Sequence, residues 1–425
     1  MSNFSALYTN ESAVIHRFEN GMTVVLEPLP HLRSVSAGIW IRVGSANESA
    51  KLNGVSHFLE HLLFKGTSSR TSRRLVEEIE SGGGHINAFT GRDFTCVYMR
   101  VLDTHVAEGL DVLADIIQDS QLFDFEKERN VILEEIASGD DVPEELAHDL
   151  FMQALWPDCA IGRPIAGSEA SVSSMDLAEV RAHYRGAYTP ANLIVSLTGN
   201  FDSGQVLDQL HTLFQDTPQG ERVPSYEMPE FAAGIQRTER DIAQSHICFG
   251  FPSGSMTNGR RFQYDMLSSA LGGGSTARLF DRIRESEGLA YSIYTFNSCY
   301  LQSGVFGVYA AVAPENLEKT LDLAFEELRK MRDAPLSADE LALNREQLKG
   351  GFLMALESTY SRMTRLAKSI FYRDRIVPVD EVIAGVDGVT AEEIQALSQE
   401  LLQADRCSLT VLGPGIGRMP ESLPL

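Results

Sequence analysis

The chain is organised around residues 54–64, which read Gly-Val-Ser-His-Phe-Leu-Glu-His-Leu-Leu-Phe. The apolar residues recur at the spacing of an amphipathic helix and form one apolar stripe along it. His57, Glu60 and His61 fall together on the opposite side, because residues three and four apart are neighbours on a helix. Two imidazoles one turn apart can bind one metal ion, and a carboxylate beside them can accept a proton from water. This H-x-x-E-H order reverses the H-E-x-x-H zinc motif and predicts a metal site that still lacks a third protein ligand.

A second helix, expected at 125–138, offers carboxylates for that missing position. Glu128 and Glu135 are seven residues apart and share a helix face, whereas Glu134 is turned away from Glu128. An acidic helix face usually meets only solvent, and that alternative stays open at this point. Because two histidines and a water leave a tetrahedral zinc one protein ligand short, we predict Glu135 as that ligand. We predict that Glu128 orients a ligand histidine.

A β-hairpin is expected over residues 85–101, entered through three glycines at 82–84 and turning at 91–93. Its first strand contains Asn87 and Ala88. If this strand lies at a sheet edge, an extended peptide can dock on it by strand addition. An ordinary hairpin without such a role is the alternative, and the residues alone favour it.

The two halves of the chain repeat one order of strands and helices, separated by a proline-rich stretch at 216–230. We expect a first domain at 1–217, a linker at 218–232 and a second domain at 233–425. A helix at 262–271 takes the place that the metal-motif helix has in the first half, although H-x-x-E-H does not recur. The predicted fold is α+β, with two structurally related domains from a diverged internal duplication. Each domain holds a mainly antiparallel sheet flanked by helices.

Composition excludes several classes of protein. The 36 lysines and arginines face 59 aspartates and glutamates, and a net charge of −23 argues against nucleic acid or anionic membrane as a partner. No apolar run approaches the ~20 residues that cross a bilayer. The first residues lack a secretory or mitochondrial signal, and the five scattered cysteines are typical of reduced thiols, so we expect a cytoplasmic protein. The acidic charge either serves solubility, which composition favours, or attracts basic peptides.

Four motifs in the same order carry a family resemblance. They are HFLEH (57–61), GGGHINAFTGRDFT (82–95), ERNVILEEI (128–136) and GGGSTARLFDRIRESEGLAYSI (272–293). From about residue 19 to 413 the chain resembles the pitrilysin-type inverzincin metallopeptidases, and within them the mitochondrial processing peptidase branch, which has bacterial single-chain members. The resemblance implies one Zn²⁺ per chain, held by His57, His61 and Glu135, with Glu60 as the catalytic base and Glu128 as a supporting acid.

The resemblance also implies residues that contact the substrate. Asn87 and Ala88 match the edge strand that pairs with substrate in this family. Arg284 and Tyr291 match an Arg/Tyr pair that contacts substrate near the scissile bond. The implied activity is hydrolysis of internal peptide bonds in peptides or unfolded segments. The implied assembly is a homodimer that encloses a chamber.

Two alternatives to this activity remain open on the same fold. One is a noncatalytic scaffold, which predicts loss of the H-x-x-E-H residues, and the other is a subunit that needs a partner chain. All matching positions are present in this chain.

Overall fold

The computed structural model describes residues 13–414 and 423, which form two compact units. The first comprises the described residues up to Ile136, together with Pro164–Tyr226 and Leu353–Glu381. The second comprises Ala137–Arg163, Glu227–Phe352 and the described residues from Val382 onward. Each unit therefore includes a segment from the other half of the chain. A division into 1–217 and 233–425 does not contain this exchange of segments.

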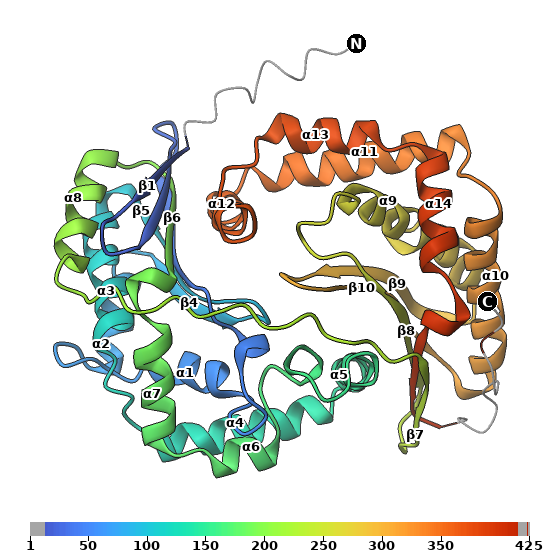
Figure 1. The fold of residues 1–425 in the computed structure, drawn as a ribbon, viewed down its shortest axis with the longest axis horizontal. Helices are drawn as coiled ribbons and strands as arrows, with labels where there is room; N and C mark the ends of the chain where they lie inside the picture. Colours follow the sequence, from blue (N-terminus) through green and yellow to red (C-terminus); the bar gives the residue numbers. More distant parts are fainter. Residues whose placement is uncertain (1–12, 415–422, 424–425) are drawn as a thin grey trace. The chain divides into compact units, whose positions relative to one another are not determined.

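The first unit is built on a six-stranded sheet in the order β1-β2-β6-β3-β5-β4, in which only the β2–β6 pair is parallel. Figure 1 labels β1, β4, β5 and β6 of this sheet. Its strands are β1 Val14–Arg17, β2 Thr23–Pro28, β3 Ser34–Ile41, β4 His85–Thr90, β5 Thr95–Leu102 and β6 Leu193–Gly199. Its helices are α1 Val55–Leu63, α2 Ser72–Glu80, α3 Val106–Asp119, α4 Phe125–Asp140, α6 Glu169–Ser174, α7 Leu177–Ala187, α8 Ser203–Phe214 and α12 Thr359–Arg373, of which α4 runs on into the second unit.

Strand β3 shows how the two faces of this sheet differ. Val35, Ala37, Ile39 and Ile41 belong to the main core of the unit, and Ser36 and Gly38, which alternate with them, face α12. The Ser36 hydroxyl lies 2.9 Å from the Thr359 hydroxyl. A Cβ at Gly38 would lie 2.9 Å from the Met363 sulfur, so the glycine lets Met363 of α12 pack directly on this strand.

The second unit is built on a five-stranded sheet in the order β7-β11-β8-β10-β9, in which the β7–β11 pair is parallel. Its strands are β7 Gly234–Thr238, β8 Ser245–Ser253, β9 Ala290–Cys299, β10 Gly304–Val312 and β11 Ser408–Leu412. Its helices are α5 Pro143–Leu155, α9 Arg261–Gly272, a π-helical turn Phe280–Ser286, α10 Leu317–Asp333, α11 Ala338–Ala355, α13 Val379–Gly388 and α14 Ala391–Leu401. Helices α11 and α13 each run across the boundary between the units.

Helix α5 packs on this second sheet through polar and aromatic side chains. His148 Nε2 lies 2.9 Å from the Tyr294 hydroxyl, which donates to Glu144 at 2.7 Å. The His148 ring stacks on Tyr309 at 5.2 Å between centroids. Burial lowers the pKa of His148, which disfavours the charged imidazolium in this contact.

The two sheets have corresponding strand orders. In both, the chain makes a central strand (β3 or β8), then a helix (α1 or α9), then an edge strand (β4 or β9). This correspondence confirms the predicted α+β fold with two related, mainly antiparallel sheets. The predicted linker contains no helix or strand between α8 and β7.

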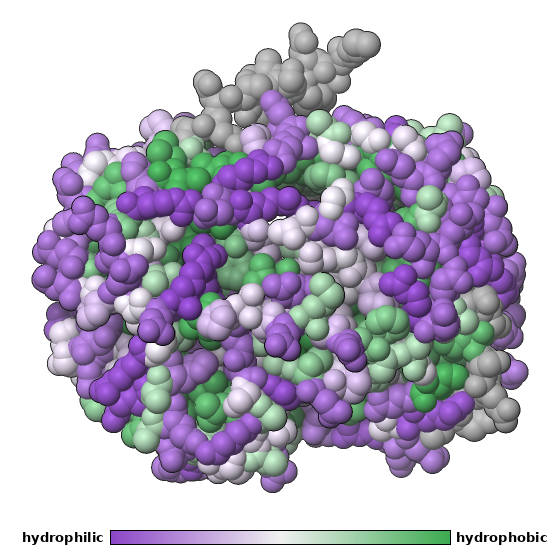
Figure 2. Space-filling view, in the orientation of Figure 1, coloured by the Kyte–Doolittle hydropathy of each residue, from purple (hydrophilic) through white to green (hydrophobic). Residues whose placement is uncertain are grey.

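The surface drawn in Figure 2 is mostly hydrophilic, as expected for a chain with 22% charged residues. Figure 2 shows that hydrophobic residues lie in separate patches on this face. Among the described residues, no helix is long and apolar enough to span a membrane. All five cysteines are free thiols.

Candidate active site

Helix α1 presents the H-x-x-E-H residues because its other face is anchored in the core. Its apolar residues are fully buried, whereas the side chain of His57 is 12% exposed and that of His61 is 21% exposed. Phe58 stacks on Phe125, the first residue of α4, with ring centroids 4.8 Å apart and planes 7° apart. This stacked pair fixes α4 beside α1.

Glu135 of α4 meets both histidines. His57 Nε2 lies 3.6 Å from Glu135 Oε1, and His61 Nε2 lies 3.3 Å from Glu135 Oε2. One ligand atom from each of the three residues lies within 4.8 Å of the other two. The contact with His57 lowers the pKa of Glu135 although burial opposes this shift. Burial opposes protonation of His57, but the Glu135 and Glu60 carboxylates raise its pKa.

This donor set fits a zinc ion. Bonds of about 2.0–2.1 Å in a tetrahedral site separate neighbouring ligand atoms by roughly 3.4 Å. The 3.3 and 3.6 Å separations at Glu135 are close to that value. Two imidazoles and one carboxylate also match the ligand set of catalytic zinc sites, which leave one position open.

Glu128 lies behind His61. Its side chain is 3% exposed, and its Oε2 lies 3.4 Å from His61 Nδ1. Its Oε1 pairs with Lys65 Nζ at 2.8 Å. Glu128 therefore contacts the ring atom opposite the proposed ligand atom, which fits its predicted orienting role. By contrast, His57 Nδ1 is buried and has no hydrogen-bond partner among the described residues.

Lys65 and Glu48 were not expected from the sequence. Lys65 follows the end of α1, so helical spacing does not connect it to Glu128. Glu48 is buried and accepts hydrogen bonds from the backbone amides of Gly54 at 2.7 Å and Ser56 at 2.8 Å. Burial raises its pKa, although these bonds oppose the shift. It replaces the side-chain cap that Gly54 cannot supply, but it lies six residues before Gly54, outside the capping-box spacing.

Glu60 lies on the exposed side of α1 and is held by the neighbouring strand. The Thr90 hydroxyl donates to Glu60 Oε2 at 2.7 Å. Thr90 is the last residue of β4, so one hydrogen bond joins the predicted catalytic base to the predicted peptide-docking strand.

Strand β4 lies at the edge of its sheet, where it pairs with β5 alone among the described strands. Asn87 is exposed, Ala88 is buried, and the Asn87 Oδ1 atom accepts a hydrogen bond from the Ala88 backbone amide at 2.8 Å. The edge position agrees with docking by strand addition, and the docking itself stays a prediction.

Arg284 and Tyr291 lie together in the second unit. The Arg284 guanidinium carbon is 5.5 Å from the centre of the Tyr291 ring and 4.7 Å from that of Phe280. Tyr291 is 80% exposed, so its hydroxyl is open to solvent. The two side chains thus form a pair, and their role toward a substrate stays a prediction.

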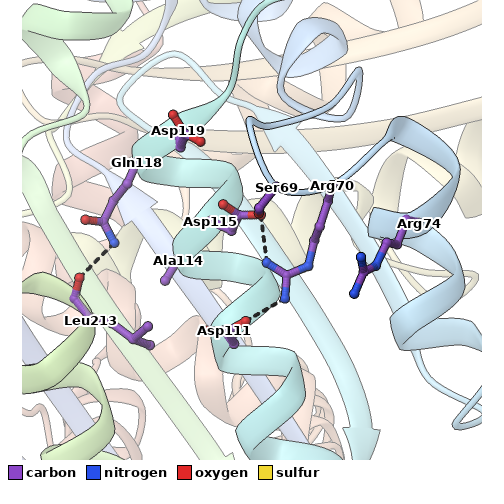
Figure 3. Close-up of a pocket in the computed structure, with 9 residues that line it drawn as sticks. All are labelled: Ser69, Arg70, Arg74, Asp111, Ala114, Asp115, Gln118, Asp119 and Leu213. Carbon is purple, nitrogen blue, oxygen red and sulfur yellow. Dashed lines mark hydrogen bonds and ion pairs between the residues drawn. The ribbon is translucent and has the colours of Figure 1, made fainter.

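A pocket of 530 Å³ in the first unit offers no comparable chemistry (Figure 3). Arg70 points between two acidic residues of α3 and bonds Asp111 at 2.5 Å and Asp115 at 2.7 Å. It also bonds Glu78 at 2.8 Å. Because these three carboxylates already bind the Arg70 guanidinium, the charged groups of this pocket pair with one another. We therefore do not propose a ligand there.

Sequence comparisons match this chain to known proteins along almost its whole length. Residues 23–169 match the insulinase family (peptidase family M16), and residues 174–348 match the peptidase M16 inactive domain. The chain is 36% identical over 405 residues to an uncharacterized zinc protease of Streptomyces coelicolor, covering 93% of this chain and 88% of that protein. It is 34% identical over 405 residues to the uncharacterized zinc protease YmxG of Bacillus subtilis, covering 95% and 98%.

Solved structures of lower identity share the fold. A protease from Helicobacter pylori superposes with a TM-score of 0.90 at 20% identity, covering 95% of this chain and 100% of that chain. A chain of complex III₂ from Candida albicans superposes with a TM-score of 0.84 at 15% identity, covering 94% and 95%. At these identities the likeness concerns the fold alone. The sequence matches, at 34–36% identity over nearly the full length, establish that the chain belongs to the insulinase (M16) peptidase family.

Proposed function

We propose that this protein is a zinc-dependent endopeptidase that hydrolyses internal bonds of peptides or unfolded segments. The observation that carries the proposal is the convergence of His57, His61 and Glu135 beside Glu60. The naming of its sequence relatives as zinc proteases supports the same reaction class.

His57, His61 and Glu135 would hold the metal, and Glu60 would move the proton. A zinc ion held by these residues would lower the pKa of a water molecule toward about 7 and would polarise the scissile carbonyl. Glu60 accepts the proton of the attacking water as the carbon–oxygen bond forms. It then delivers that proton to the leaving nitrogen as the carbon–nitrogen bond breaks, so the carboxylate returns to its starting state.

The peptide would bind as an added strand along β4. Asn87 and Ala88 lie on that edge strand, and the Asn87 side chain can change partners because it is exposed. Arg284 and Tyr291 would donate hydrogen bonds to the substrate near the cleaved bond and stabilise the developing oxyanion. Their mutual contact and the exposure of Tyr291 support this assignment.

The proposal extends to assembly and substrate charge. We expect a homodimer that encloses a chamber, as the family resemblance implies, and a preference for basic peptides. The net charge of −23 supports that preference through long-range attraction. Sedimentation equilibrium tests the dimer. Cleavage rates of one peptide series with increasing lysine content, measured at two salt concentrations, test the charge preference.

The decisive test combines metal content with cleavage of a quenched peptide library. Wild type should hold one zinc per chain, lose activity to a chelator and regain it with zinc. Glu60→Gln should keep the zinc but cleave roughly 10²- to 10⁴-fold more slowly, the usual contribution of general acid–base catalysis. Equal activity in wild type and Glu60→Gln contradicts the proposal.

A noncatalytic or partner-dependent subunit of the same fold is the second candidate. A chain of complex III₂ has the same fold, so the fold is compatible with a subunit role, whereas the intact donor set favours catalysis. A zinc-loaded protein that cleaves none of the library peptides alone would support this candidate.

A further inference from the structure

Thr90 links the edge strand to the residue proposed as the base. Its Oγ1 donates to Glu60 Oε2 at 2.7 Å and also lies 3.4 Å from the Ser56 carbonyl oxygen. Alternate residues of a strand share a face, so Thr90 shares the face of Ile86 and Ala88, which are buried in the core. The backbone at Thr90 is further fixed by its pairing with Thr95 of β5.

The Glu60 side chain depends on this contact for its orientation. Glutamate has three rotatable side-chain bonds, and fixing them carries a cost in entropy. Among the residues that the structure describes, no hydrogen-bond partner of the Glu60 carboxylate other than Thr90 is found. The bond holds Oε2 toward β4 and leaves Oε1 free to accept a proton.

We infer that Thr90 is a positioning residue, whose hydroxyl fixes the Glu60 carboxylate relative to the strand that receives the peptide. Thr90 lies two residues beyond Ala88 on the same strand, so a peptide docked there and the base share one rigid element. This inference rests on the proposed peptidase function. It adds a residue that holds the base without touching metal or substrate.

The second unit supplies an internal control. Thr295 of β9 donates to the Ser268 carbonyl oxygen of α9 at 2.7 Å, and the Ser268 hydroxyl donates to Thr295 Oγ1 at 3.0 Å. A threonine therefore ties a helix to an edge strand in both units, but only Thr90 bonds a carboxylate. Removing the Thr295 hydroxyl removes the tether alone, whereas removing the Thr90 hydroxyl also releases Glu60.

The experiment compares Thr90→Val, Thr90→Ala and Thr90→Ser with Thr295→Val in the full-length zinc-loaded protein. Thr90→Val and Thr90→Ala should lower kcat roughly 10- to 100-fold, the range that follows from a small misplacement of a reacting group. Zinc content should stay at one per chain, because Thr90 does not contact the proposed metal ligands. KM should stay within about twofold, because Thr90 would not contact the peptide. Thr90→Ser keeps the hydroxyl and should retain most of the activity. Thr295→Val should leave kcat unchanged.

The outcomes separate this inference from the proposed function. If Glu60→Gln is inactive while Thr90→Val and Thr90→Ala keep wild-type kcat, the positioning role is wrong and the peptidase proposal stands. If Glu60→Gln is fully active, Glu60 is not the base, and both statements fail. A loss of zinc in Thr90→Ala, or an equal loss of kcat in Thr295→Val, would show a general structural role and also overturn the inference. Comparing Val with Ala guards against misfolding of either variant.

Discussion

Helices α1 and α9 occupy corresponding places in the two units but carry different chemistry. Phe58-Leu59 and Leu62-Leu63 of α1 are buried at the same spacing as Met266-Leu267 and Ala270-Leu271 of α9. Aligning these pairs matches His57, Glu60 and His61 with the α9 residues Asp265, Ser268 and Ser269. The apolar face that makes the fold is thus kept in both helices, and the polar positions differ.

The polar residues of α9 are engaged within their own unit. Asn297 donates to Asp265 Oδ1 at 2.9 Å, and Ser269 donates to Asn344 Oδ1 at 2.6 Å. In α1, by contrast, His57 and His61 converge with Glu135 of α4. These two histidines and Glu135 make the one potential metal-binding group found among the described residues. The two units thus contain similar platforms, each made of a helix and an edge strand (α1 with β4, and α9 with β9). Three side chains decide which platform can hold a metal.

The largest expected effect comes from removing the ligand on α4. Glu135→Ala should lose zinc and reduce cleavage more than roughly 10³-fold, because two histidines alone leave the metal short of protein ligands. Glu134→Ala is the matched control, since this exposed acid lies one residue away. Zinc content and kcat/KM measure both effects. A Glu135→Ala variant that keeps zinc would place the site elsewhere.

A smaller loss is expected from the ion pair that joins α12 to the first sheet. The Arg362–Glu27 pair is 2.6 Å long, and the Glu27 side chain is 2% exposed. Arg362→Met leaves this carboxylate unpaired and should cost about 3–5 kcal/mol in the free energy of unfolding. Arg375→Met removes the exposed pair with Glu381 and should cost less than about 1 kcal/mol. Urea unfolding measures both, and equal costs would contradict this account.

A still smaller effect, on zinc affinity, is expected from substituting the residues that support His61. Lys65→Met and Glu128→Gln should each weaken zinc binding roughly 10- to 100-fold, as partners of metal ligands commonly do. Lys127→Met is the control, because Lys127 is an exposed neighbour of Glu128. Competition with a zinc chelator measures the affinity. Unchanged affinity in both test variants would mean that Glu128 does not orient His61.

The smallest expected effect concerns the α9 residue that matches His57. Burial raises the pKa of Asp265. A raised carboxyl pKa favours the protonated folded state, so its stabilising contribution is present below about pH 4 and is lost as pH rises through the folded pKa. Asp265→Asn should therefore gain stability over wild type at pH 7 relative to pH 4. Urea unfolding at the two pH values measures this, and a difference that does not change with pH contradicts it.

Much of the fold and of the candidate site can be predicted from sequence periodicity, because these features depend on residues that are close in the sequence. The helix of His57, the shared face of Glu128 and Glu135, the β4–β5 hairpin and the repeated order of elements all follow from spacing within short windows. Glu48, Lys65 and Thr90 were missed because their partners lie in separate elements or outside standard cap spacing. The exchange of α5 and α12 was missed for the same reason. The Ser36–Thr359 contact joins residues 323 positions apart, and no local pattern encodes it.

The claim that one of two similar platforms holds the metal is tested most directly by anomalous diffraction at the zinc edge. Crystals of zinc-loaded Glu60→Gln should show one peak per chain, about 2.0–2.2 Å from the imidazole nitrogens of His57 and His61 and from a Glu135 oxygen. No peak should lie beside Asp265, Ser268 and Ser269. A zinc peak in the second unit would contradict this claim. If the wild type is active, a zinc peak away from His57 would contradict it as well.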